Sequence, residues 1–253
     1  MPLQALLFDV DGTLADTERD GHRIAFNAAF RDYGLDWEWD VALYGKLLAV
    51  TGGKERIKHY LSEFRPDYTP PRHFDELVVQ LHEAKTRHYI RQLEHGEIPL
   101  RPGVKRLLAE ARDAGLRLAI ATTTTPANVS ALLKYSLADE AADWFEVIAA
   151  GDIVPAKKPA SDIYLWAMQQ MQVSAADCFA FEDSANGIRS SAGAGIKTLV
   201  TVNDYTFDHD FSGAVAVVSD LGEPGAPPQV LQGSLHGQSY VNLAAIYDWY
   251  ENA

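Results

Sequence analysis

The stretch LLFDVDGTLADTE, residues 6–18, opens with an apolar run typical of a buried strand and then places Asp9 and Asp11 two residues apart, directly before Gly12 and Thr13. Hydrophobic cores exclude unpaired charge, so two acids at the end of a buried strand need a cation, a reaction or solvent beside them. The rest of the chain indicates which of these three surrounds the pair.

Apolar runs of strand length recur along the chain and alternate with helical segments. In one such segment, RPGVKRLLAEARDAG, Pro102 suits a first helical turn, apolar side chains recur on one face and Gly115 ends the helix. Nearly continuous apolar strands separated by helices predict a parallel sheet covered on both faces, which is an α/β doubly wound, Rossmann-like core. The expected strands are residues 5–8, 116–121, 147–150, 178–181, 198–202 and 214–218.

Residues 17–92 break this alternation, because they show helical periodicity and no convincing strand. An all-helical block inserted after the first strand predicts a small cap domain, with a discontinuous core formed by residues 1–16 and 93–253. Residues 222–253 are rich in Gly, Pro and Gln before they turn apolar and aromatic. We expect them to form a strap and a terminal helix packed on the core.

The charge balance limits the classes of partner. The 253 residues include 22 basic and 35 acidic side chains, a formal net charge of −13. A surface for nucleic acid or an anionic membrane needs clustered positive charge, so neither partner is expected, whereas a small anionic substrate needs only one local positive pocket. The single cysteine, Cys178, excludes an intramolecular disulfide and fits a reducing compartment. The sequence carries no export signal or long apolar segment, so we expect a cytoplasmic protein. We also expect a monomer.

Asp9 and Asp11 could serve a metal and a reaction together. Side chains two apart on a strand point to the same side, so both carboxylates are expected at the carboxyl end of the sheet, where open α/β folds bind ligands. Mg²⁺ accepts one or two carboxylates with water and phosphate oxygens. One carboxylate could attack phosphorus while its neighbour moves a proton. The alternative is a plain strand-ending turn, for which Asp and Gly are ordinary residues.

Polar residues after other expected strands favour the functional interpretation. LAIATTTT ends a strand with hydroxyls and places Thr122 to hold a phosphate oxygen. AKKPASDIY puts Lys158 just before a proline and a helix, and CFAFEDSANG ends an apolar strand in Glu182 and Asp183. Taken singly, a threonine run is commonly a turn and a lysine before proline a solvated loop. Together they predict one site that binds a metal and a phosphate.

These residues stand in the order of four family motifs. DVDGTL, the threonine after the second strand, the lysine before its proline and EDS resemble the motifs of the haloacid dehalogenase-like phosphatase superfamily. The resemblance implies that Asp9 is the nucleophile that becomes an aspartyl phosphate and that Asp11 is the general acid and base. It also implies that Thr122 and Lys158 bind the phosphoryl group. The dehalogenases of the superfamily lack the second aspartate and the metal, so Asp11 argues against that chemistry.

The same resemblance implies a Mg²⁺ site. Its ligands would be Asp9, the main-chain carbonyl of Asp11, and Asp183, with Glu182 in or beside the coordination sphere. Oxygen ligands also accept Mn²⁺ and Co²⁺, and Mg²⁺ is expected because it is the most available.

The helical insert is similar to the cap of the branch that contains β-phosphoglucomutase. DTERDGHRIAFN and LLAVTGGKERIKHYL resemble the CbbY-type phosphatases, which act on xylulose 1,5-bisphosphate, a misfire product that inhibits Rubisco. A bisphosphate needs a second phosphate site, and Lys54 and Arg56 beside two glycines could supply its charges and N–H groups. The expected substrate-binding residues are Glu18, His22, Gly52, Gly53, Lys54, Arg56 and Thr123.

Several alternatives are compatible with the same sequence. Lys54 and Arg56 could be solvated at a helix start, and His22 could be a packing histidine. The enzyme could be a phosphosugar mutase, or a phosphatase for another small ester such as phosphoglycolate. A catalytically silent regulatory protein is a third possibility, against which the filled catalytic positions argue.

Overall fold

The computed structural model describes residues 2–252, which divide into two compact units. The larger unit runs to Asp16 and resumes at Pro99, and the smaller unit is Thr17–Ile98. Every strand belongs to the larger unit, and the described residues of the smaller unit form helices and turns. None of the helices within residues 2–252 combines the length and hydropathy needed to cross a bilayer.

The larger unit is built on a seven-stranded sheet of order β3-β2-β1-β4-β5-β6-β7. Neighbouring strands are parallel except β6 and β7. Because β1 lies between β2 and β4, Phe8 at its end stands opposite Ile120 and Phe181, and three strands end side by side. The strands are β1 (Ala5–Phe8), β2 (Arg117–Ala121), β3 (Val147–Ala149), β4 (Cys178–Glu182), β5 (Lys197–Thr201), β6 (Ala216–Val218) and β7 (Val230–Gln232).

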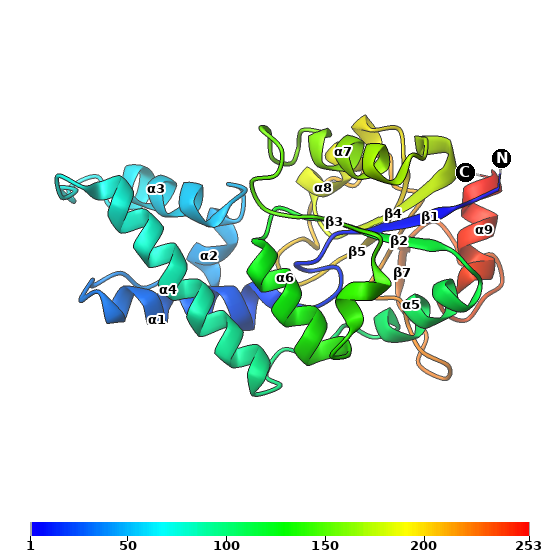
Figure 1. Cartoon of the computed structure of the whole chain (residues 1–253), viewed down its shortest axis with the longest axis horizontal. Helices are drawn as coiled ribbons and strands as arrows, with labels where there is room; N and C mark the ends of the chain where they lie inside the picture. The colour runs from blue at the N-terminus through cyan, green and yellow to red at the C-terminus, as the bar shows by residue number, and fades with distance from the viewer. Residues whose placement is uncertain (1, 253) are drawn as a thin grey trace. The chain divides into compact units, whose positions relative to one another are not determined.

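Helices cover both faces of this sheet (Figure 1). Alternate strand residues such as Ala5 and Leu7 pack under α7, where Tyr164 and Ala167 are fully buried. On the other face Phe179 stacks on Trp249 of α9, with ring centroids 6.3 Å apart. The helices of the larger unit are α5 (Val104–Asp113), α6 (Pro126–Leu132), α7 (Asp162–Met171), α8 (Ala185–Gly193) and α9 (Leu243–Asn252). The α/β core with a mainly parallel sheet is thus confirmed.

The C-terminal segment contributes an antiparallel edge strand, β7, that the sequence analysis did not predict. The strand has three residues, of which two are exposed, and it lies in a Gly- and Pro-rich stretch where strand periodicity is absent. Arg106 of α5 fastens the segment by donating hydrogen bonds to the carbonyl oxygens of Gly222 and Val241, both at 2.9 Å. Its guanidinium also lies 4.3 Å from the ring centroid of Tyr240.

The smaller unit is an all-helical bundle. Its helices are α1 (Arg23–Asp32), α2 (Val41–Leu47), α3 (Gly53–Phe64) and α4 (Phe74–Glu94), preceded by a π-helical turn, Glu18–His22. Rings of Phe26, Phe30 and Trp39 form the core, with centroids 4.7 Å apart for Phe26 and Trp39. Asp40 is the N-cap of α2, and its carboxylate accepts a hydrogen bond from the N–H of Leu43 at 2.7 Å.

Candidate active site

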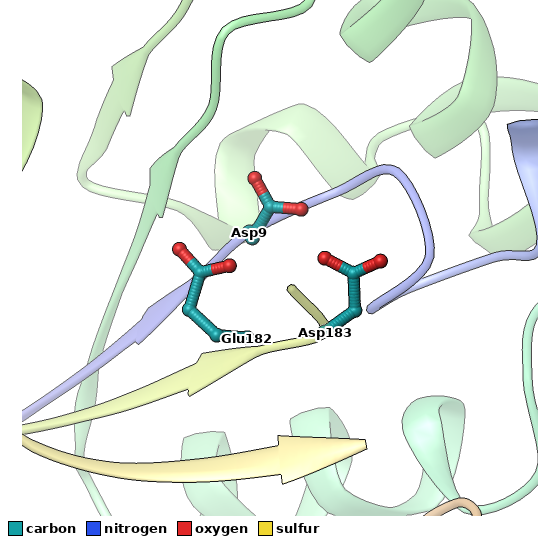
Figure 2. A group of neighbouring side chains, drawn as sticks. All are labelled: Asp9, Glu182 and Asp183. Atoms are coloured by element: carbon teal, nitrogen blue, oxygen red, sulfur yellow. The ribbon is translucent and has the colours of Figure 1, made fainter. Parts of the chain in front are cut away.

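Three acidic side chains meet where β1 and β4 end. Asp9 directly follows β1, Glu182 is the last residue of β4 and Asp183 comes next. Each contributes a carboxylate oxygen to a group whose members all lie within 4.8 Å of one another, and all three residues are buried (Figure 2). Parallel pairing of β1 with β4 therefore brings together acids that are far apart in the sequence.

Lys158 bridges two of these acids. Its Nζ donates hydrogen bonds to Asp9 Oδ1 at 2.7 Å and to Glu182 Oε1 at 2.6 Å. The hydroxyl of Tyr164 donates a third hydrogen bond, also to Glu182 Oε1, at 2.5 Å. Asp183 accepts a hydrogen bond from the neutral amide of Asn203 at 2.7 Å. The ammonium group offsets only part of the charge of three carboxylates.

The pKa values reflect this excess of buried acid. Burial raises the pKa of Asp9 from 3.8 to about 7, with Glu182 and Asp11 adding to the shift and Lys158 opposing it. Burial, together with the charges of Asp9 and Glu182, also holds the pKa of Asp183 well above its usual range. Burial alone would lower the pKa of Lys158, but the two acids that it contacts raise it instead.

The carboxylate group fits a divalent cation. Its donors are oxygens only, the ligand type of hard cations such as Mg²⁺, and a cation would favour the ionised forms that burial disfavours. Asp9, Glu182 and Asp183 are the side chains that would hold it. The side chain of Asp11 is not part of this group, so its expected contribution is limited to the main-chain carbonyl.

Mg²⁺ is expected to raise the melting temperature of the metal-free protein more at about pH 8 than at about pH 5.5. Because the pKa of Asp9 is higher in the folded than in the unfolded chain, the metal-free protein loses stability as the pH rises from about 4 to 7. Above this window the Asp9 carboxylate is ionised and available to the cation. At a concentration about 100-fold above its Kd, Mg²⁺ adds about 2.7 kcal/mol, or about 5–10 °C. Differential scanning fluorimetry measures the shift, with NaCl at matched ionic strength as control, and equal shifts at both pH values would contradict the prediction.

Two glycines allow the backbone to approach these acids. Gly12 has φ +86°, and a Cβ there would overlap the side chains of Asp183 and Asn203. A Cβ at Gly187, near the start of α8, would overlap the carboxylate of Glu182. Both positions therefore require glycine for close approach.

The remaining site residues expected in the larger unit are Thr122, Thr123 and Asp11. Thr122 is buried, its N–H donates to the Ala149 carbonyl at 2.9 Å, and its hydroxyl accepts from the N–H of Thr124 at 3.3 Å. Thr123 is half-buried. Asp11 is half-buried in the loop after β1, near enough for its charge to raise the pKa of Asp9.

In the smaller unit Glu18 and Arg56 meet through Tyr44. The Tyr44 hydroxyl donates to Glu18 Oε2 at 2.5 Å, and Arg56 Nη1 donates to the Tyr44 oxygen at 2.8 Å. Arg56 Nη1 also lies 3.6 Å from Glu18 Oε2. Arg56 is buried, so the alternative of a solvated helix start is wrong for this residue.

The other expected cap residues lie at two places in the helical unit. His22 is buried with its ring centroid 4.1 Å from that of Tyr89, an arrangement that suits a packing histidine. Gly52 has φ +99° and directly precedes α3, and a Cβ at Gly53, the first residue of that helix, would overlap the ring of His82. Lys54 is half-buried in the first turn of that helix.

Sequence reasoning missed three polar residues that hold the expected ones. Tyr44 was not among the expected site residues, yet its hydroxyl joins Glu18 to Arg56. Tyr164 and Asn203, which bond Glu182 and Asp183, were not singled out. The available signal was a polar atom at an otherwise apolar position of a helix, as in DIYLWAM, where Tyr164 lies among buried apolar residues.

Comparisons with known proteins agree with this geometry. A family model described as haloacid dehalogenase-like hydrolase matches residues 3–195. Plasmid-encoded CbbY of Cupriavidus necator is 48% identical over 252 residues, which cover 98% of this chain and 97% of that protein. CbbY from Rhodobacter sphaeroides, solved in complex with phosphate, is 44% identical with a TM-score of 0.80 over 86% of this chain and 94% of that one. A variant of it, solved with xylulose 1,5-bisphosphate, is 43% identical with a TM-score of 0.81 over 88% and 96%. The chain therefore belongs to the haloacid dehalogenase-like hydrolases, and within them it is a phosphatase of the CbbY type.

Proposed function

We propose that this enzyme is a Mg²⁺-dependent phosphatase that hydrolyses xylulose 1,5-bisphosphate to xylulose 5-phosphate and thereby protects Rubisco. The observation that carries the substrate is the complex of the related CbbY with this bisphosphate, in a chain 43% identical to the present one. A cytoplasmic location and a monomeric state remain predictions that go with this role.

In the proposed mechanism Asp9 and Asp11 divide the chemistry. An oxygen of Asp9 attacks phosphorus and the bond to the sugar oxygen breaks, while protonated Asp11 gives its proton to that leaving oxygen. Ionised Asp11 then takes a proton from water, whose oxygen attacks the aspartyl phosphate and releases phosphate and free Asp9. When bound, Mg²⁺ supplies positive charge that stabilises the phosphoryl oxygens.

Lys158 and Thr122 would bind and stabilise the phosphoryl group during its transfer. Lys158 already contacts Asp9, so its ammonium charge stands at the reacting carboxylate. The buried Thr122 offers a hydroxyl at the end of the strand that neighbours β1, and Thr123 follows it. Charge placed beforehand in a buried site stabilises a transition state more than charge in water does.

Lys54, Arg56, Gly52 and Gly53 are proposed to bind the second phosphate, and Glu18 and His22 the sugar hydroxyls. What supports the assignment in the helical unit is that α3 begins at Gly53, directly after Gly52, and that Arg56 and Glu18 are both hydrogen-bonded to the Tyr44 hydroxyl. A helix start offers N–H groups to an anion in addition to the two side-chain charges.

Phosphate release tests the substrate. We expect Mg²⁺-dependent turnover that strongly favours xylulose 1,5-bisphosphate over ribulose 1,5-bisphosphate, β-glucose 1-phosphate and phosphoglycolate, and that stops when a chelator is added. Preference for another ester would overturn the substrate assignment alone. Isomerised product without net phosphate release would identify a mutase, and absence of any turnover would overturn the proposed function.

Replacing Lys54 with methionine is expected to raise KM for the bisphosphate about 10- to 100-fold with little change in kcat, because a charged contact to a remote phosphate contributes about 1.5–3 kcal/mol to binding. The KM for p-nitrophenyl phosphate, which lacks a second phosphate, should stay unchanged. Lys58→Met is the matched control, since Lys58 lies on the same helix and pairs with the exposed Asp75 at 2.6 Å. Equal effects on both substrates would argue against a second phosphate site at Lys54.

A further inference from the structure

Arg101 has its side chain buried in the larger unit, an unusual place for an arginine. Its Nη2 donates to the carbonyl oxygens of Val202 and Ser219, both at 2.5 Å, at the ends of β5 and β6. Its Nη1 donates to the carbonyl of Gly12, in the loop after β1. The third nitrogen, Nε, lies 3.5 Å from Asp16 Oδ1. Each guanidinium nitrogen thus has an acceptor.

The loop that Arg101 contacts is the one that carries Asp11. Main-chain hydrogen bonds close this loop tightly, from the N–H of Gly12 to the carbonyl of Ala15 at 2.8 Å and from the N–H of Leu14 to Val10 at 2.9 Å. The N–H of Arg101 donates to the Leu14 carbonyl at 2.9 Å as well. Arg101 therefore holds the loop through its main chain and its side chain together.

The same loop also packs against a proposed metal ligand. Gly12 lies so close to Asp183 and Asn203 that no Cβ could be accommodated between them. The residue next to Asp11 is thus held by the guanidinium of Arg101 and packed closely against Asp183. Loss of the guanidinium would remove one of the contacts that fix that loop.

We propose that Arg101 is a positioning residue, which holds the loop of residues 10–15 so that the carboxylate of Asp11 can protonate the leaving oxygen. The inference rests on the proposed function, because it assumes the acid role of Asp11. Arginine suits the task because its planar fork reaches acceptors in three directions, whereas the single nitrogen of lysine cannot.

The dependence on the leaving group separates positioning of an acid from support of the fold. A nitrophenolate leaves without a proton, whereas the alkoxide of a sugar needs one. A misplaced Asp11 should therefore slow phosphoryl transfer from a sugar ester more than transfer from p-nitrophenyl phosphate. A general loss of structure would slow both alike.

The test measures the first-turnover rate of phosphoryl transfer by rapid quench with xylulose 1,5-bisphosphate and by stopped flow with p-nitrophenyl phosphate. Arg101→Met is expected to lose at least about tenfold more rate on the sugar ester than on the aryl ester. Asp11→Asn should show the same selective loss and serves as the reference. Should the methionine variant fail to fold, Arg101→Lys is compared in the same way.

Arg106→Met is the matched control. Arg106 also donates to main-chain carbonyls, but these belong to Leu221 and to the C-terminal segment that follows it, so its loss should lower the melting temperature without changing the ratio of the two rates. Equal losses on both esters in the Arg101 variants, or no loss, would overturn the inference and leave the proposed function intact. A wild type that hydrolyses neither ester would overturn the proposed function and this inference with it.

Discussion

Replacing Asp9 with asparagine is expected to lower turnover by roughly 10⁴-fold or more, because the amide cannot attack phosphorus. The fold should persist, since asparagine has nearly the same size and its Oδ1 can still accept the hydrogen bond that Lys158 donates at 2.7 Å. Asparagine also removes a carboxylate whose charged form is disfavoured, first by burial and then by the charges of Glu182 and Asp11, which together raise the pKa of Asp9 to about 7.

Two measurements separate loss of the nucleophile from loss of structure. Thermal melting should show a folded variant, and a beryllium fluoride adduct, which mimics an aspartyl phosphate, should form with Mg²⁺ in the wild type and not in the variant. Asp152→Asn is the control, because Asp152 is an exposed acid paired with Lys157 at 3.0 Å. Turnover of the Asp9 variant close to that of the wild type would mean that another group attacks phosphorus.

Replacing Lys158 with methionine is expected to have the second largest effect, because it removes both a phosphate-binding charge and the cation between two buried acids. We expect kcat to fall about 10²–10³-fold, the usual result of removing one stabilising group from a buried site. In the metal-free protein near neutral pH the stability should fall by about 3–5 kcal/mol, the typical cost of leaving buried charge unpaired. Both acids that Lys158 contacts are themselves buried.

The pH dependence distinguishes this explanation from a simple packing defect. Lys158 lowers the pKa of Asp9, which is about 7 in the wild type, so Asp9 should keep its proton to higher pH in Lys158→Met. The stability lost in the variant should therefore shrink as the pH falls from the alkaline side toward about 7, and Mg²⁺ at higher pH should restore part of it. Urea denaturation with and without Mg²⁺ measures both trends. Lys157→Met is the control, since Lys157 is the neighbouring lysine and pairs with the exposed Asp152 at 3.0 Å. A loss of stability that is the same at all pH values would favour a packing defect.

Much of the core could be predicted from the sequence because the signals are local and strong. Strand runs such as Ala5–Phe8 are continuously apolar, and helix α5 ends at Asp113, just before Gly115, the glycine that its pattern indicates as the stop. The group of three carboxylates could also be predicted from the sequence. Acids that end two apolar strands must converge if those strands are neighbours in a parallel sheet. Hydrophobic periodicity and the residues at strand ends are therefore enough to predict most of the core fold and the centre of the site.

The remainder depends on contacts between residues distant in the sequence. Nothing in the segment around Arg101 indicates that its guanidinium gathers carbonyls from the ends of β5 and β6. Tyr164 looks like an ordinary core residue until its hydroxyl is found against Glu182. The short strand β7 exists because β6 offers it an edge, and three residues carry too little periodicity to reveal it.

The central position of β1 has a consequence for how the enzyme is made. The nucleophile lies beside the first strand to leave the ribosome, yet that strand pairs only with β2 and β4, which are synthesised much later. The helical unit, Thr17–Ile98, is continuous in the chain, so we expect it to fold before β2 and β4 have been synthesised and can pair with β1. A nascent chain that stops before β4 would carry Asp9 but neither Glu182 nor Asp183, so the growing polypeptide acquires its acidic centre only in the last third of its synthesis.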